Sequence, residues 1–228
     1  KIKKKYKINI IEDCAESIGS KYKKQYCGSF GDVSTFSFYG NKTITTGEGG
    51  MVVCKKNSIY NKIVKLKSQG LNIKKINNFY NHEIIGYNYR MTNICASIGL
   101  SQLKKLDYFI KKKRKIFSLY QKFLNNNYVK FQEKINATES TYWLVTILLK
   151  NAKLKNSLQK HLLNNSIETR PIFTPMSKLK MYKQSNKEFK NSNKIYYSGI
   201  SLPSFPDLSN NEIKKICKII NIYLLKKL

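Results

Sequence analysis

The sequence has few acidic residues, few histidines and no long uncharged apolar run. Thirteen Asp and Glu residues stand against 43 Lys and Arg residues, and there are two histidines. A membrane-spanning helix needs about 18 or more consecutive apolar residues, so we expect none here. We also expect no secretory signal, because the first residues lack the pattern of a signal peptide. Five cysteines without CxxC spacing predict no metal site and favour a reducing, cytoplasmic location.

The excess of lysine gives a formal net charge of +30. Such a charge is typical of proteins that bind nucleic acid or anionic membranes. Here the lysines are spread along the whole chain, as in "KIKKK", "KKKRK" and "LLKKL", and are not gathered beside stacking aromatic residues. We therefore expect neither a nucleic-acid nor a membrane partner, and we keep a basic nucleic-acid-binding protein as an alternative.

The first part of the chain predicts strands of an α/β sheet. Residues 8–13, "INIIED", form a short apolar run that ends in two carboxylates, as in a buried parallel strand that delivers acids to the ligand-binding edge of a sheet. Residues 21–40 predict two short strands and residues 49–56 a further one. Residues 57–70 have apolar positions at helical spacing and predict a helix with Gly70 as its C-cap.

The remainder predicts a long helical region followed by a small α+β unit. The predicted strands cover 128–132, 141–150 and 167–173, and the predicted helices cover 94–124 (one helix or two in succession), 153–165 and 209–228. Ser209 and Glu212 have the spacing of a capping box. We expect two domains, 1–110 and 111–228. The chain opens with Lys and a helix-like stretch that runs straight into a strand, so we expect an N-terminal part to be missing.

Three polar side chains and a glycine-rich loop form the candidate site. Asp13 ends the first predicted strand, Lys42 precedes the loop "TTGEGG", and Ser37 stands five residues before Lys42. A carboxylate can keep a ring nitrogen protonated, an activated lysine can attack a carbonyl, and a hydroxyl can hold a phosphate oxygen. Those are the groups that a pyridoxal phosphate enzyme needs. On spacing alone, an ordinary polar turn fits equally well, because the loop matches neither GxGxxG nor the Walker pattern.

Four longer segments resemble one family of enzymes. "IEDCAES", "GSFGDVSTFSFYGNKTITTGEGGMVV", "IGYNYRMTNICASIGLSQL" and "ETRPIF" are similar, in this order, to the DegT-type sugar-nucleotide aminotransferases. These are pyridoxal phosphate enzymes with the aspartate aminotransferase fold (fold type I). The resemblance implies the C-terminal part of the large cofactor-binding domain plus a small α+β domain. The part that seems to be lacking would carry the phosphate-binding loop and the aromatic residue that stacks on the cofactor ring.

The resemblance also implies roles for single residues. Lys42 matches the lysine that binds the cofactor covalently, and Asp13 matches the acid that pairs with the ring nitrogen. Glu16 falls near the phenolic oxygen of the cofactor, Ser37 matches the phosphate-binding serine, and Asn88 matches an asparagine that reaches the cofactor of the neighbouring subunit. A homodimer with shared sites follows. Each residue also has a structural alternative: a cap for Asp13, strand hydrogen bonding for Ser37, a turn for Asn88 and a solvated helix position for Glu16.

Three further residues are candidates for substrate binding: His82, Arg90 and Arg170. A surface histidine and structural ion pairs are the alternatives for them. The family implies transfer of an amino group from glutamate, through pyridoxamine phosphate, to a 4-keto-6-deoxy sugar nucleotide. The subgroup most similar in sequence uses GDP-4-keto-6-deoxymannose and makes GDP-perosamine for surface polysaccharide. A non-catalytic remnant of the same fold is the other alternative. We expect the glycine loop to let the chain pass close to the cofactor and the second subunit.

Overall fold

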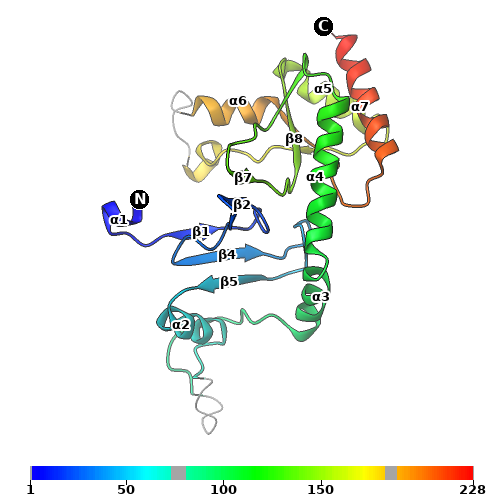
Figure 1. Cartoon of the computed structure of the whole chain (residues 1–228). Coiled ribbons are helices and arrows are strands. Elements are labelled where there is room, and N and C mark those ends of the chain that lie inside the picture. Colours follow the sequence, from blue (N-terminus) through cyan, green and yellow to red (C-terminus); the bar gives the residue numbers. More distant parts are fainter. Residues whose placement is uncertain (1, 73–80, 183–188, 228) are drawn as a thin grey trace. The chain divides into compact units, whose positions relative to one another are not determined.

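The computed structural model describes residues 2–72, 81–182 and 189–227 (Figure 1). The chain divides into two compact units. Unit 1 comprises Lys1–Tyr108 and Ala137–Thr141, and unit 2 comprises Phe109–Asn136 and Tyr142–Leu228. Within the described ranges, no helix combines the length and the apolar character needed to cross a bilayer.

A three-stranded sheet in the order β1-β4-β5 forms the centre of unit 1. Strand β1 runs parallel to β4, and β4 runs antiparallel to β5. The strands are β1 (Ile11–Asp13), β4 (Val33–Ser37) and β5 (Gly50–Cys54). The predicted parallel strand and the strand at the glycine loop are thus confirmed. The predicted burial of the first strand is wrong for this chain, because Ile11 is 71% exposed.

A second, smaller sheet in unit 1 has the order β3-β2-β7. Its strands are β2 (Lys21–Tyr22), β3 (Gln25–Tyr26) and β7 (Thr138–Glu139). Residues 21–40 therefore hold three strands, β2, β3 and β4, and not the two that were predicted. The hairpin of β2 and β3 turns at Lys23 and Lys24, both with positive φ, and neither residue type signals such a turn.

The helices of unit 1 are α1 (Ile2–Tyr6), α2 (Asn57–Lys67) and α3 (Asn93–Leu103). Helix α2 ends earlier than predicted, with Ser68 as its C-cap. Gly70 still serves the helix end, because its N–H donates to the carbonyl of Lys65 at 2.8 Å and its φ is +80°. The predicted helical region 94–124 consists of two helices in succession, α3 and α4 (Leu106–Phe123).

Unit 2 is built on a four-stranded sheet in the order β6-β8-β10-β9. Its strands are β6 (Val129–Phe131), β8 (Val145–Leu149), β9 (Arg170–Pro171) and β10 (Gly199–Leu202). Its helices are most of α4, then α5 (Lys155–Asn164), α6 (Lys190–Ser198) and α7 (Asn210–Leu225). The predicted capping box is present at the start of α7, between Ser209 and Glu212. Strand β10 and helix α6 were not predicted.

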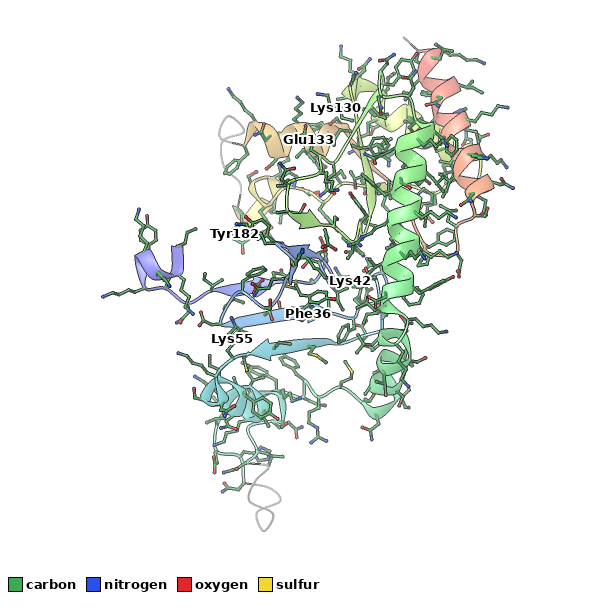
Figure 2. The ribbon with its side chains drawn as sticks, in the orientation of Figure 1. Phe36, Lys42, Lys55, Lys130, Glu133 and Tyr182 are labelled. Carbon is green, nitrogen blue, oxygen red and sulfur yellow. The ribbon has the colours of Figure 1, made fainter. Side chains whose placement is uncertain are left out.

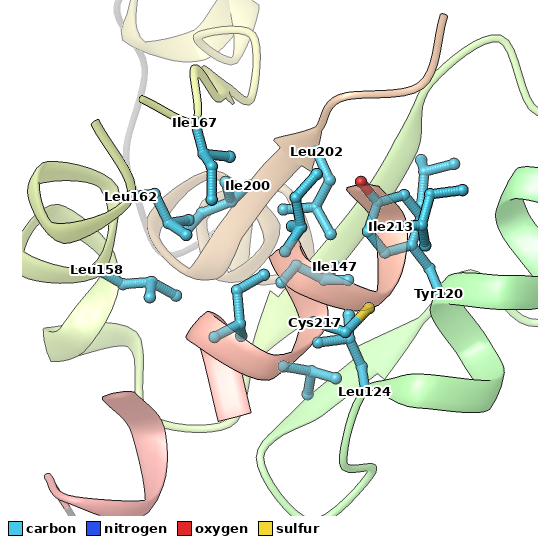
Figure 3. Packing of buried hydrophobic residues seen from close by; sticks show 14 of the residues in the cluster. Tyr120, Leu124, Ile147, Leu158, Leu162, Ile167, Ile200, Leu202, Ile213 and Cys217 are labelled. Carbon is cyan, nitrogen blue, oxygen red and sulfur yellow. The ribbon is translucent and has the colours of Figure 1, made fainter. Parts of the chain in front are cut away.

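The main hydrophobic core lies in unit 2. Side chains from α4, α5, α7 and the sheet pack together there, and Figure 3 shows Ile147, Leu158 and Ile213 pointing into a common interior. All three are fully buried. Helix α4 contributes Tyr120 to this core, and the hydroxyl of Tyr120 donates to the carbonyl of Pro203 at 2.9 Å. Burial raises the pKa of that hydroxyl, so it remains a hydrogen-bond donor.

Candidate active site

Two candidate residues lie at a common edge of the central sheet in unit 1. Asp13 ends β1, Ser37 ends β4, and the two strands are parallel, with Asp13 opposite Thr35. The carboxyl ends of parallel strands are where α/β proteins bind ligands. Asp13 is exposed, and its Oδ1 accepts the N–H of Ala15 at 3.1 Å. The carboxylate and the hydroxyl therefore reach the same edge, as the sequence predicted for a ligand site.

Lys42 belongs to a tight turn that follows β4. The N–H of Lys42 donates to the carbonyl of Tyr39 at 3.0 Å, and the N–H of Thr46 donates to the carbonyl of Phe38 at 2.9 Å. Figure 2 shows Lys42 at one end of the sheet and Lys55, which follows β5, at the other. The Lys42 side chain is 12% exposed, and its Nζ lies 3.4 Å from Oε1 of Glu16. The structure thus brings Asp13, Glu16, Ser37 and Lys42 to one end of β1 and β4.

Glu12 organises the turn behind this edge, a role that sequence reasoning missed. Its carboxylate accepts three backbone N–H groups, from Gly28 at 2.8 Å, Phe30 at 2.7 Å and Gly31 at 2.6 Å. Burial alone would raise the pKa of the Glu12 carboxyl, but these donors together outweigh burial and lower it. The signal in the sequence was the first of the two carboxylates in "INIIED", followed by the glycine turn "CGSFG".

The glycine loop packs closely against its own chain. A Cβ on Gly50 would lie 2.6 Å from the carbonyl oxygen of Phe36, and one on Gly49 would lie 2.9 Å from Cε of Met91. Helix α3 also touches the loop, because the N–H of Thr45 donates to Oε1 of Gln102 at 3.0 Å. These contacts give a structural reason for the glycines in addition to the expected approach to a cofactor and a second subunit.

Asn88, His82 and Arg90 lie in unit 1 but on other elements. Asn88 forms a β-bridge with Ser68, beside the end of α2. The Nδ1 atom of His82 is 2.7 Å from the carbonyl oxygen of Gln69, so this nitrogen carries a proton. Arg90 is exposed and precedes α3 by three residues. The site group at the end of β1 and β4 contains none of the three.

Arg170 belongs to unit 2. It lies in β9, pairs with Ser201 of β10 and forms an ion pair with Glu168 at 2.9 Å, with both side chains largely exposed. Among the described residues of the two units, no three His, Cys, Asp or Glu side chains are close enough to hold a metal ion.

The model of the DegT/DnrJ/EryC1/StrS aminotransferase family matches residues 1–221. The chain belongs to this family. Two curated members are GDP-perosamine synthases: that of Escherichia coli O157:H7 is 47% identical over 218 residues, and that of Vibrio cholerae is 44% identical over 220 residues. The matches cover 96% and 95% of this chain but 59% of each relative, so the chain spans about three-fifths of their length.

Solved structures confirm the fold class of this DegT/DnrJ/EryC1/StrS family member. A putative sugar aminotransferase from Streptococcus pneumoniae, in its apo form, superposes with a TM-score of 0.90 at 26% sequence identity. The superposition covers 99% of this chain and 60% of that one. The same protein has also been solved in a PLP form and a PMP form.

The residues at the edge of β1 and β4 fit the chemistry of pyridoxal phosphate. Lys42 could supply an amine for a carbonyl carbon, Asp13 a carboxylate for a ring nitrogen and Ser37 a hydroxyl for a phosphate oxygen. The carboxylate of Glu16 already holds the lysine amine at this edge. The carboxyl ends of β1 and β4 in this family member therefore bring together an amine, a carboxylate and a hydroxyl.

Proposed function

We propose that this chain forms part of a pyridoxal phosphate-dependent aminotransferase that moves an amino group from glutamate to a 4-keto-6-deoxy sugar nucleotide. The observation that carries the proposal is the gathering of Asp13, Ser37 and Lys42 at the shared end of β1 and β4. The 47% identity to a GDP-perosamine synthase supports GDP-4-keto-6-deoxymannose as substrate and GDP-perosamine as product. The expected place of the reaction is the cytoplasm, in the synthesis of surface polysaccharide such as O-antigen.

Each side chain of the group has a distinct task. Pyridoxal phosphate, when bound, supplies an electron sink for the negative charge that develops on the substrate carbon. Lys42 would provide the amine that holds the cofactor, and once that amine is free again it would carry a proton to or from the substrate carbon. Asp13 keeps a proton on the ring nitrogen, and Ser37 donates to a phosphate oxygen. Glu16 holds the Lys42 ammonium at the strand edge, at 3.4 Å.

The remaining candidates are assigned to the substrates and to a second subunit. We propose a homodimer in which Asn88 reaches the cofactor phosphate of the neighbouring subunit. His82, Arg90 and Arg170 are the residues proposed to contact the sugar nucleotide or the amino donor. The exposure of Arg90 and Arg170 leaves their guanidinium groups accessible to anionic ligands.

The proposal is tested at Lys42, with Lys55 as the control. Lys55 stands at the opposite end of the sheet, where its Nζ donates to the carbonyl of Phe30 at 3.1 Å. We expect borohydride, added after pyridoxal phosphate, to fix the cofactor on Lys42, as read by peptide mass spectrometry. Lys42→Ala should abolish this label and the visible absorbance of the bound cofactor, whereas Lys55→Ala should keep both. A label that persists in Lys42→Ala would overturn the assignment.

The same experiment separates the alternatives. A chain that never takes up the cofactor, even together with the part of a relative that lies outside the match, is a non-catalytic remnant. Retention on DNA that falls steeply with salt would instead favour a basic nucleic-acid-binding protein. In an active preparation, the position of the amino group on the isolated sugar product decides whether C4 is the carbon that is aminated.

A further inference from the structure

The loop that follows Lys42 is closed by its own backbone and hydroxyl groups. At its base, the N–H of Phe38 donates to the carbonyl of Gly49 at 3.0 Å. Inside the loop, the hydroxyl of Thr45 donates to the carbonyl of Phe38 at 2.9 Å and accepts the N–H of Gly47 at 2.9 Å. The loop therefore follows a defined path, and the backbone that carries Lys42 leads directly into it.

One side of helix α3 faces this loop. Cys95, Gly99 and Gln102 are half-buried, and their helical spacing of four and then three residues places them on the same side of the helix. A Cβ on Gly99 would lie 2.8 Å from Cγ2 of Thr46, so the helix and the loop are close at this point. At Gln102, the side-chain Oε1 accepts the N–H of Thr45 at 3.0 Å. Helix α3 thus approaches the loop at Gly99 and binds it at Gln102.

The amine of Lys42 depends on the loop for its position. The Lys42 side chain is 12% exposed, whereas that of Glu16, which lies 3.4 Å away, is 51% exposed. Water screens an ion pair with an exposed partner, so the carboxylate alone holds the amine weakly. The N–H of Thr45, three residues after Lys42, donates in a part-buried position, where an unpaired N–H is unfavourable. The oxygen of Gln102 therefore favours the loop conformation in which Lys42 is enclosed.

We propose that Gln102 is a positioning residue for the Lys42 amine. By accepting the Thr45 N–H, it keeps the loop against α3 and thereby keeps Lys42 at the carboxyl ends of β1 and β4. The inference rests on the proposed function, in which the lysine amine binds the carbonyl carbon of the cofactor and later moves a proton. Both steps need the amine in one place, because a small displacement of a reacting group slows its reaction strongly.

Acetylation of the cofactor-free chain tests this assignment. Gln102→Met keeps the length of the side chain but removes the acceptor oxygen, whereas Gln102→Glu keeps an acceptor. Gln121→Met is the control, because it makes the same exchange at an exposed position of α4. The probe is acetic anhydride, and the readout is the acetylation rate of Lys42 relative to Lys55 in the same sample, by peptide mass spectrometry.

We expect Gln102→Met to raise the relative acetylation rate of Lys42 by about fivefold, the factor that corresponds to one lost hydrogen bond. The amine then leaves its enclosed position more often. Gln102→Glu and Gln121→Met should both keep the wild-type rate. The thiol of Cys14 is 2% exposed and belongs to the same unit, so it reports whether unit 1 as a whole stays folded. It should remain unreactive in Gln102→Met.

Three outcomes of the acetylation experiment would overturn the proposal. The first is an unchanged Lys42 rate in Gln102→Met, and the second is a raised rate in Gln102→Glu as well, because the acceptor would then be irrelevant. The third is an equal gain in reactivity at Cys14, because Gln102 would then stabilise unit 1 in general and would not position one side chain.

The binding of the cofactor is measured on the chain combined with the part of a relative that lies outside the match. The Lys42 amine adds to the aldehyde carbon of pyridoxal phosphate and water leaves, and the visible absorbance follows the rate. We expect Gln102→Met to slow this step by about fivefold and Gln102→Glu to keep it. A wild-type rate in Gln102→Met would contradict the positioning role. If the wild type takes up no pyridoxal phosphate, the proposed function fails, while the acetylation rates still decide whether Gln102 positions Lys42.

Discussion

Glu12 stands next to Asp13 and holds the turn that backs the candidate site. Three N–H donors converge on its carboxylate, and hydrogen bonds to charged groups contribute about 1.5–3 kcal/mol each at most sites. We expect Glu12→Gln to destabilise unit 1 by about 1 kcal/mol or more, because an amide is a weaker acceptor than a carboxylate. The urea concentration at which the buried thiol of Cys14 becomes reactive measures the loss.

The pH dependence of the Glu12 contribution has a defined sign. The pKa of this carboxyl is lowered in the folded chain, so its stabilising effect is present above the ordinary value of 4.5. It disappears as the pH falls through the lowered folded value. Glu12→Gln should reduce the loss of stability of unit 1 at low pH. Asp13→Asn removes one exposed contact and should leave most of that pH dependence in place.

Lys113 of unit 2 has a buried amine. It lies in α4 and donates to the carbonyls of Trp143 and Ser204, each at 2.9 Å. Burial lowers the pKa of Lys113 from 10.5 to about 8. Unfolding therefore takes up a proton between these values, so stability rises with pH across this window. We expect wild type to gain up to about 3 kcal/mol relative to Lys113→Met from pH 8 to 10.5.

Urea unfolding followed by fluorescence of the single tryptophan, Trp143, measures this difference. The exposed neighbour Lys111 provides the control, and Lys111→Met should track the wild type at each pH. An equal pH dependence of wild type and Lys113→Met would contradict the expectation.

The sequence points to the candidate site residues more directly than to the residues that support them. Lys42 and Asp13 stand in contiguous motifs, so a resemblance to known proteins finds them. The role of Glu12 depends on a turn 16 to 19 residues away, whose N–H groups converge only after folding. The same holds for Gln102, which meets the Thr45 backbone from a helix 57 residues further on.

At the scale of elements, the start of α7 offers a direct test of helix capping. The N–H of Glu212 donates to Oγ of Ser209 at 3.2 Å, and the N–H of Ser209 donates to Oε2 of Glu212 at 2.8 Å. Ser209→Ala should destabilise unit 2 by about 1 kcal/mol, a typical value for a lost N-cap. The urea midpoint from Trp143 fluorescence measures the effect. Ser118→Ala should leave that midpoint unchanged, since Ser118 bonds within α4 to the carbonyl of Lys115.

The elements that were missed lack local signals. Strand β10 is four residues long and buried on both faces, so "GISL" shows no alternation of polar and apolar positions. Helix α6 contains three Asn and Ser residues in its first turns, which are poor helix formers. Both elements are specified by neighbours far away in the chain. By contrast, α7 was predicted with its cap, because its signals lie within its own residues.

At the scale of the whole molecule, the two units differ in how much apolar surface they bury. We therefore expect them to unfold separately, with unit 1 opening at lower urea. Cys14 of unit 1 and Cys217 of unit 2 are 2% and 1% exposed and report on each unit. Thiol labelling read by peptide mass spectrometry should modify Cys14 first. Simultaneous labelling of both would mean that the chain unfolds as one cooperative unit.

The short strand β7 has a consequence for recombination between relatives. Residues 137–141 belong to unit 1 and pair with β2, although the chain on either side of them belongs to unit 2. A chimera joined at a single crossover near residue 108 would combine β2 of one parent with β7 of the other. Exchanging the whole of unit 1 therefore needs three junctions. The structural unit that recombination would have to transfer is encoded by two separate stretches of the gene.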